Sequence, residues 1–260
     1  MSTGVMLDDL GEGVFRIRFE RPERMNALGV ETVAALRAGV EDAARRQARV
    51  LLLRGSGRAF CAGADLKERR TMDLSARMAH NAGINAAVNA VAASGCVTVA
   101  VLNGLALGGG LELAMACDLR LAARGISLGL TESRVGAFPG AGGTQRLPRL
   151  VGASRALHMM LTGEPVDSAA ALSMGLVNEV VEPEALDARA LALARLLASR
   201  SAPAQAALKQ LVYRGIELPL AEALAQERAA LPAILGSADY AEGLAAFEAR
   251  RAPRFTDTLR

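Results

Sequence analysis

Strand patterns alternate with helix patterns through the first two thirds of the chain, and this alternation limits the fold more than any other feature of the sequence. Residues 14–19 read Val-Phe-Arg-Ile-Arg-Phe, an alternation typical of a strand, and residues 97–102 are rich in β-branched side chains. A helix pattern lies between them over residues 29–46. The alternation predicts a layered α/β core. From residue 184 onward helix patterns follow one another, so we expect a helical cap or an oligomerisation region there.

Two segments, residues 50–67 and 97–112, read as strand, turn and helix, and both turns are made of small residues. Ligand sites in α/β proteins lie at the carboxyl ends of strands, so both turns could face one ligand. Gly109 would begin a helix, where unpaired N–H groups favour negative charge. The N–H groups of Ala64 and Gly109 could therefore form an oxyanion hole. The alternative is that the glycines only allow a helix to pack close to a sheet.

Familiar phosphate-binding motifs do not account for these glycines. Gly104 and Gly109 have the spacing of a P-loop, but Gly110 stands where that motif requires lysine. Residues 140–147 lack the third glycine of a dinucleotide fingerprint, because position 145 is Gln. The sequence therefore favours backbone N–H groups, rather than a nucleotide-binding loop, as the groups that contact a ligand.

Two glutamates also lie just after predicted strands or at the start of a predicted helix. Glu112 lies just inside an apolar helix pattern, and Glu132 follows a short strand pattern. Either one alone could be a helix-terminal or turn residue. Together, near two candidate N–H donors, they would supply paired acids for proton transfer.

Composition excludes several classes of protein. Lysine and arginine total 30 against 27 acidic residues, and this balance of +3 offers no basic stripe for a nucleic acid. The three cysteines lack C-x-x-C spacing and the two histidines stand apart, so we expect no metal site and no disulfide framework. No segment is apolar enough to span a membrane and none resembles a signal peptide, so we expect a cytoplasmic protein.

Five segments carry a resemblance to a known family. They are residues 21–28 (RPERMNAL), 60–67 (FCAGADLK), 103–118 (NGLALGGGLELAMACD), 131–147 (TESRVGAFPGAGGTQRL) and 240–255 (YAEGLAAFEARRAPRF). In this order, over almost the whole chain, they resemble the enoyl-CoA hydratase/isomerase, or crotonase, family. The resemblance implies an α/β fold, a crotonase-like spiral of repeated ββα units with the acyl-CoA site over residues 1–195. It also implies a C-terminal helical region over residues 196–260 for trimerisation, with a homotrimer or a hexamer made of two trimers.

The resemblance assigns roles to residues of this sequence. The thioester oxygen of the substrate would be held by the N–H groups of Ala64 and Gly109, and Glu112 and Glu132 would be the catalytic glutamates. Substrate-binding positions would be Arg24, Ala62, Asp65, Leu66, Lys67, Gly140, Phe247 and Arg250. The last two would approach coenzyme A from the C-terminal helices, including those of a neighbouring subunit. The Gly140 N–H would be associated with the water site.

Two of these residues keep a second interpretation. Asp65 could instead be structural and accept local backbone hydrogen bonds. Lys67 could lie on a solvated helix face rather than contact a phosphate of coenzyme A.

The leading functional prediction is hydration of a trans-2-enoyl-CoA to a 3-hydroxyacyl-CoA by syn addition of water, in fatty-acid or branched-chain acyl-CoA catabolism such as β-oxidation. No cofactor is expected, because coenzyme A is part of the substrate. Double-bond isomerisation and hydration of a branched substrate such as 3-methylglutaconyl-CoA remain open. A non-catalytic acyl-CoA-binding or RNA-binding relative is the alternative of another class. Thr131 stands where many hydratases have proline, which leaves the preferred acyl chain open.

Overall fold

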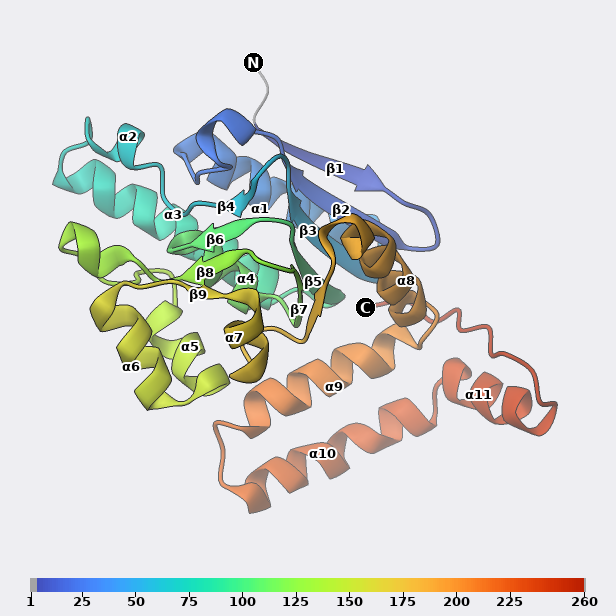
Figure 1. The fold of residues 1–260 in the computed structure, drawn as a ribbon. Helices are drawn as coiled ribbons and strands as arrows, with labels where there is room; N and C mark the ends of the chain where they lie inside the picture. Colours follow the sequence, from blue (N-terminus) through green and yellow to red (C-terminus); the bar gives the residue numbers. More distant parts are fainter. Residues whose placement is uncertain (1–3, 260) are drawn as a thin grey trace.

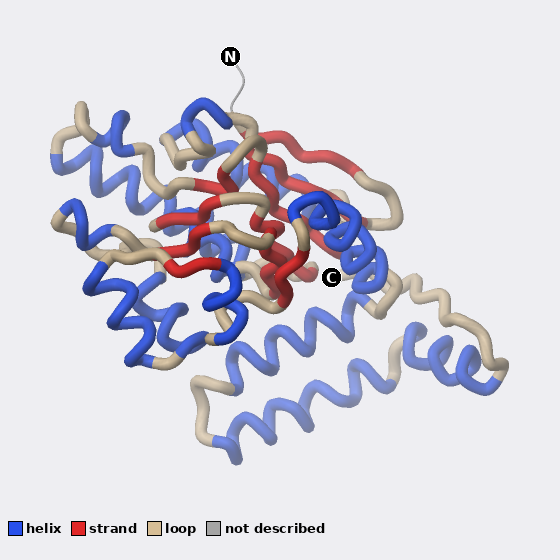
Figure 2. The backbone as a smooth tube through the Cα atoms, in the orientation of Figure 1, coloured by secondary structure: helices blue, strands red, loops and turns tan. Residues whose placement is uncertain are grey.

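A computed structural model describes residues 4–259, and two β-sheets form its centre (Figures 1 and 2). The six-stranded sheet has the order β1 (Val5–Asp9), β2 (Val14–Phe19), β3 (Val50–Gly55), β5 (Val97–Leu102), β7 (Leu119–Ala123), β10 (Glu179–Val181). The four-stranded sheet has the order β4 (Ala59–Cys61), β6 (Leu105–Leu107), β8 (Ser127–Gly129), β9 (Val166–Asp167). The pairs β1–β2 and β8–β9 are antiparallel, and the other neighbours are parallel.

Successive ββα units build both sheets at once. The strand pairs β3–β4, β5–β6 and β7–β8 each place their first strand in the large sheet and their second in the small one. Helices or short helical turns follow each pair: α2 (Leu66–Arg69) and α3 (Leu74–Ala92), then α4 (Gly109–Ala116), then η2 (Glu132–Val135) and α5 (Gly143–Val151). The repeat therefore brings the ends of β4, β6 and β8 to one edge of the small sheet.

The central strands β3 and β5 are buried on both faces, which explains their near-continuous apolar sequences. On β5, Val99 and Val101 belong to a core cluster with α8 (Leu186–Ala198), whereas Ala100 and Leu102 belong to the main cluster on the other face. The main cluster also contains residues of α1 (Val30–Arg45), α3 and α4. The predicted α/β layering is therefore present.

Shorter elements complete the part of the chain that carries the sheets. They are η1 (Pro22–Arg24), α6 (Ala153–Thr162), α7 (Ser168–Ser173) and η3 (Pro183–Ala185). No helix within residues 4–259 is both long and apolar enough to cross a membrane.

The last three helices, α9 (Ala202–Gly215), α10 (Leu220–Leu235) and α11 (Ala238–Glu248), extend away from the sheets (Figure 1). Partly buried contacts of Lys209 hold α9 to the core. Its Nζ lies 2.7 Å from Asp118 Oδ2 and donates to the carbonyl oxygens of Ser94 and Cys96. No residue of α10 is buried. The expected boundary at residue 195 falls inside α8, which continues to Ala198, so the division into two regions stays a prediction.

Candidate active site

Three parallel strands of the small sheet end at one edge, and a predicted site residue follows each of them. Ala64 comes after β4, Gly109 comes directly after the turn that ends β6, and Glu132 comes after β8. Because β4, β6 and β8 are neighbours, residues that are far apart in the sequence meet at this edge. This arrangement corresponds to the general location of ligand sites in α/β folds.

The N–H groups of Ala64 and Gly109 are both available to a ligand. Leu28 and Ala64 form an isolated parallel bridge. The Leu28 N–H donates to Gly63 O (2.8 Å), and Leu28 O accepts from the Asp65 N–H (3.1 Å). In this pattern the Ala64 N–H points away from Leu28. Gly109 is the first residue of α4, so its N–H has no partner within the helix. Neither N–H has an acceptor among residues 4–259, and a methyl group on Gly109 would lie 3.7 Å from the Ala64 nitrogen.

The three glycines at the start of α4 have different structural roles. A methyl group on Gly110 would lie 2.1 Å from the carbonyl oxygen of Cys61, so Gly110 lets α4 pack directly on β4. Gly108 has φ +51°, and a methyl group there would lie 2.8 Å from Glu132 Oε1. Gly109 has only ordinary contacts around its Cα. The packing explanation therefore holds for Gly110, while Gly109 faces the cavity.

Glu112 is 2% exposed and is fixed by backbone donors. Its Oε1 accepts hydrogen bonds of 2.7 Å from the N–H groups of Ala141 and Gly143, the latter being the first residue of α5. Burial raises the pKa of Glu112 above its usual value, although the two N–H donors act in the opposite direction. The second oxygen, Oε2, accepts no hydrogen bond within the described chain, and Glu112 lines the cavity.

Glu132 begins the 3₁₀ turn η2 and has a different environment. Its Oε2 is buried without a hydrogen-bond partner among residues 4–259. Burial raises the pKa of Glu132 to about 7, and the negative charge of Glu112 contributes in the same direction. At neutral pH this carboxyl group therefore exists in both protonation states, as a proton donor or acceptor should.

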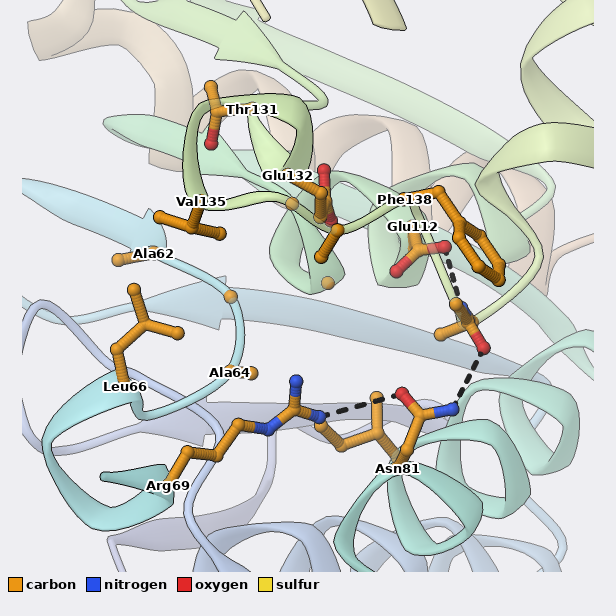
Figure 3. Close-up of a pocket in the computed structure, with 17 residues that line it drawn as sticks. Ala62, Ala64, Leu66, Arg69, Asn81, Glu112, Thr131, Glu132, Val135 and Phe138 are labelled. Atoms are coloured by element: carbon orange, nitrogen blue, oxygen red, sulfur yellow. Dashed lines mark hydrogen bonds between the residues drawn. The ribbon is translucent and has the colours of Figure 1, made fainter. Parts of the chain in front are cut away.

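A single cavity joins these groups (Figure 3). In the figure Glu112 and Glu132 lie on one wall, and Leu66, Arg69 and Asn81 lie on the facing wall. The predicted residues that line it are Ala62, Ala64, Leu66, Gly109, Glu112, Glu132 and Gly140. Apolar side chains of Leu66, Ile84, Val135 and Phe138 line the rest of the space.

Gly140 lines the cavity, and two side chains of α3 anchor its backbone. Its carbonyl oxygen accepts hydrogen bonds from the amide groups of Asn81 (3.3 Å) and Asn85 (2.5 Å). Its own N–H has no acceptor among the residues that the structure describes. The backbone donors that hold Glu112 therefore follow a residue that is itself anchored to α3.

Asp65 and Arg24 do not line the cavity and instead form an ion pair with each other. Both carboxylate oxygens of Asp65 lie 2.7 Å from an Arg24 nitrogen, and Asp65 caps α2 by accepting the N–H groups of Lys67 and Glu68. Burial raises the pKa of Asp65, but Arg24 and the Glu68 N–H lower it more, so that its pKa is below the usual value. The carboxylate of Asp65 thus has the local role that the sequence allowed.

Three further predicted residues lie outside the cavity. Lys67 is exposed on α2, next to the cavity-lining Leu66. Phe247, which is 85% exposed, lies on α11, and Arg250 follows that helix. Figure 1 places α11 at the opposite end of the molecule from α2, so one copy of the chain does not bring these residues to the cavity.

Sequence reasoning missed Arg69, Asn81 and His80. Arg69 Nε donates to His80 Nδ1 (3.2 Å), and an Arg69 Nη nitrogen lies 3.5 Å from Asn81 Oδ1. The only signal for Arg69 is its position three residues after Leu66, which puts both on one face of a helix. No group of three His, Cys, Asp or Glu side chains within residues 4–259 is arranged to hold a metal ion.

Comparison with known proteins places this geometry in context. The family model described as enoyl-CoA hydratase/isomerase matches residues 9–258. The mouse protein "Enoyl-CoA hydratase domain-containing protein 2, mitochondrial" is 41% identical over 256 residues, covering 94% of this chain and 84% of the relative. A "Probable enoyl-CoA hydratase" of Rhizobium meliloti is 39% identical over 259 residues, covering 98% of this chain and 99% of the relative.

The structural comparison agrees. The crystal structure of enoyl-CoA hydratase from Bacillus anthracis superposes with a TM-score of 0.95 at 36% identity, covering 97% of this chain and 98% of that one. The predicted resemblance and the predicted α/β spiral of ββα units are therefore confirmed. The mouse relative is described as mitochondrial, and the cytoplasmic location expected for this chain stays a prediction.

Proposed function

Because the chain belongs to the enoyl-CoA hydratase/isomerase family, we propose that it adds water to a trans-2-enoyl-CoA and releases a 3-hydroxyacyl-CoA. The observation that carries the proposal is the meeting of Glu112 and Glu132 in one cavity with the unpaired N–H groups of Ala64 and Gly109. Coenzyme A enters and leaves as part of the substrate, so the reaction uses no separate cofactor.

The two N–H groups stabilise the reacting thioester. Attack on the β-carbon moves negative charge onto the thioester oxygen, and two aligned donors hold that charge without reorganising. The Gly109 N–H also lies at the N-terminus of α4, where the helix dipole favours an anion. Removal of one such donor typically reduces the rate by roughly 100- to 1000-fold.

The two glutamates divide the proton transfers. Glu112, ionised and held through Oε1, orients a water molecule with Oε2 and accepts its proton while the oxygen bonds to the β-carbon. Glu132, with its pKa near 7, gives a proton to the α-carbon. Two carboxyl groups that share one water titrate as a coupled pair, so the pH dependence belongs to both.

The apolar lining supports an acyl substrate. Leu66, Val135 and Phe138 are large, exposed side chains at the same cavity as the acids. Exposed apolar side chains that converge on a cavity are typical of a ligand site. They would contact the acyl chain, while Lys67 and Arg24 lie outside, where the coenzyme A portion would extend.

We further propose that copies of the chain assemble as a trimer or a pair of trimers. The helices α9 to α11 expose many large apolar side chains, which are Leu208, Val212, Leu220, Leu224, Leu231, Leu235, Leu244 and Phe247. A face of this kind is characteristic of an interface between subunits. Assembly would also let Phe247 and Arg250 reach the cavity of a neighbouring copy. Sedimentation of the full chain tests this proposal, and a purely monomeric species at micromolar concentration contradicts it.

The function is tested with crotonyl-CoA. The native chain should remove the absorbance of the conjugated enoyl thioester, and mass spectrometry should find a product heavier by one water. Incubation with a 3-enoyl-CoA separates the alternative, because a conjugated isomer without added water would indicate an isomerase. Binding of acyl-CoA without turnover of either substrate would indicate a non-catalytic relative and overturn the proposal.

A further inference from the structure

We propose that Arg69 recognises a carboxylate at the far end of the acyl group, so that the preferred substrate is an enoyl-CoA whose acyl chain is itself an acid. The proposal rests on the proposed function and narrows its substrate class. Arg69 ends α2 and lines the cavity together with Glu112 and Glu132. Figure 3 shows its guanidinium on the wall that faces the two acids.

Within the described part of the chain, the hydrogen-bond partners of the Arg69 guanidinium are neutral. Its Nε donates to His80 Nδ1 (3.2 Å), and its contact with Asn81 Oδ1 is long, at 3.5 Å. His80 is 4% exposed, and its Nε2 lies 2.8 Å from Leu28 O. Since a carbonyl can only accept, Nε2 carries the proton and Nδ1 is left to accept from Arg69. These contacts orient the Arg69 guanidinium but do not neutralise its positive charge.

A half-buried cation without a counter-ion is an unusual feature. No carboxylate oxygen among residues 4–259 lies within ion-pair distance of Arg69, and one Nη nitrogen has no hydrogen-bond partner there. Burial lowers the pKa of Arg69, yet a guanidinium stays charged at any physiological pH. Desolvating such a charge is costly unless an anion meets it, so the cavity is prepared for an anionic ligand group.

The catalytic acids do not fill this need. Glu112 Oε1 accepts the N–H groups of Ala141 and Gly143, and Glu132 Oε2 has no hydrogen-bond partner within residues 4–259. Their charges attract Arg69 across the cavity without forming a pair. A carboxylate on the acyl group would approach from the space between the walls and present two oxygens to the planar guanidinium, which binds carboxylates bidentately.

The native enzyme provides the first test. The carboxylated substrate is trans-glutaconyl-CoA, and its neutral match is trans-5-methyl-2-hexenoyl-CoA, in which two methyl groups replace the carboxylate oxygens. We expect kcat/KM for the carboxylated substrate to exceed that for the neutral match by roughly 10- to 100-fold, the usual range for a charge-assisted pair. A ratio of one or below overturns the proposal. Failure to hydrate any enoyl-CoA, crotonyl-CoA included, would instead refute the proposed function.

Variants provide the second test. Arg69→Met should bring the ratio of the two kcat/KM values to about one, and Arg69→Lys should give an intermediate ratio because it keeps the charge and loses the planar fork. The control is Arg70→Met, an exposed neighbour on the same segment, which should leave the ratio unchanged. If Arg69 contacted a phosphate of coenzyme A, Arg69→Met would weaken both substrates equally and preserve the ratio, which would also overturn the proposal.

Discussion

Glu112 and Glu132 line one cavity, yet Glu112 Oε1 accepts the N–H groups of two other residues, whereas Glu132 Oε2 is buried without a hydrogen-bond partner among residues 4–259. Hydrogen bonds to the charged form favour ionisation, whereas burial without donors favours the neutral form. Two residues of the same type are thereby prepared for different protonation states.

Glu132→Gln should reduce hydration of crotonyl-CoA by roughly 100- to 10,000-fold, because an amide cannot give a proton to the α-carbon. The decrease in enoyl absorbance at saturating substrate measures it. The matched control is Glu184→Gln, an exposed glutamate of η3, which should keep the native rate. Native turnover by Glu132→Gln would remove Glu132 from the mechanism.

The pH profile should show the raised pKa of Glu132. As the acid, this residue must be protonated, so kcat/KM should fall as pH rises through about 7. In the same experiment Glu132→Gln should lose this descending limb. A profile that stays flat between pH 6 and pH 9 for the native chain would contradict the assignment.

The same group predicts a pH-dependent difference in stability. The pKa of Glu132 is about 7 in the folded chain and about 4.5 when it is unfolded, so the folded state binds the proton more tightly. Folding is therefore disfavoured progressively as pH rises from about 4.5 to about 7. Relative to the native chain, Glu132→Gln should gain about 1–2 kcal/mol of unfolding free energy at pH 8, allowing for the solvent that reaches this carboxylate, and almost none at pH 4.5. Urea unfolding at both values measures this, and a gain independent of pH would speak against burial as the cause.

Gly108→Ala should damage the site beyond its cost in stability. The new methyl group would meet Glu132 Oε1 at 2.8 Å and would also strain a residue with φ +51°. Gly125→Ala is the matched control, because Gly125 has φ +79° with nothing within 4 Å of its added methyl. Both variants should lose about 1–2 kcal/mol of unfolding free energy, and only Gly108→Ala should lose most of its activity. Equal activities for the two variants would show that the contact with Glu132 is unimportant.

Lys209→Met should loosen α9 from the core. Its removal leaves the partly buried Asp118 carboxylate without its counter-ion and two carbonyl oxygens without their donor. We expect a loss of about 3 kcal/mol in the free energy of unfolding, typical of a broken buried pair. Lys67→Met is the control, since Lys67 is exposed, and its effect should stay within about 0.5 kcal/mol. Similar stabilities of the two variants in urea would show that α9 is held mainly by other contacts.

The local patterns of the sequence predicted the layers of the fold but not every element. The apolar segments of β3 and β5 are visible because central parallel strands are buried on both faces. Helix α5 was not predicted, because its first turn depends on Glu112 of α4 accepting the Gly143 N–H. A contact between residues so far apart in the chain leaves no periodic signal.

The candidate site was predicted in a similarly uneven way. Ala64 and Gly109 could be located because each follows a strand within a segment of small residues, so backbone alone determines their position. Arg69 could not be placed, because α2 is four residues long and its direction depends on the Asp65 cap and on His80 of another helix. Phe247 lies on α11 and Arg250 follows that helix, which Figure 1 places at the opposite end of the molecule from α2, so their predicted role depends on contacts between copies.

The contact of Gly110 with the carbonyl of Cys61 limits how this catalyst can change over evolutionary time. The wall proposed to activate the thioester is main chain, and a larger residue at position 110 would clash with the Cys61 backbone. Selection for new substrates must therefore act on the side chains around the rest of the cavity, which come from α2, α3 and the 135–138 segment. In a lineage built on this scaffold, reactivity would be inherited almost unchanged while substrate preference diverged through a few positions such as 69, 81 and 138.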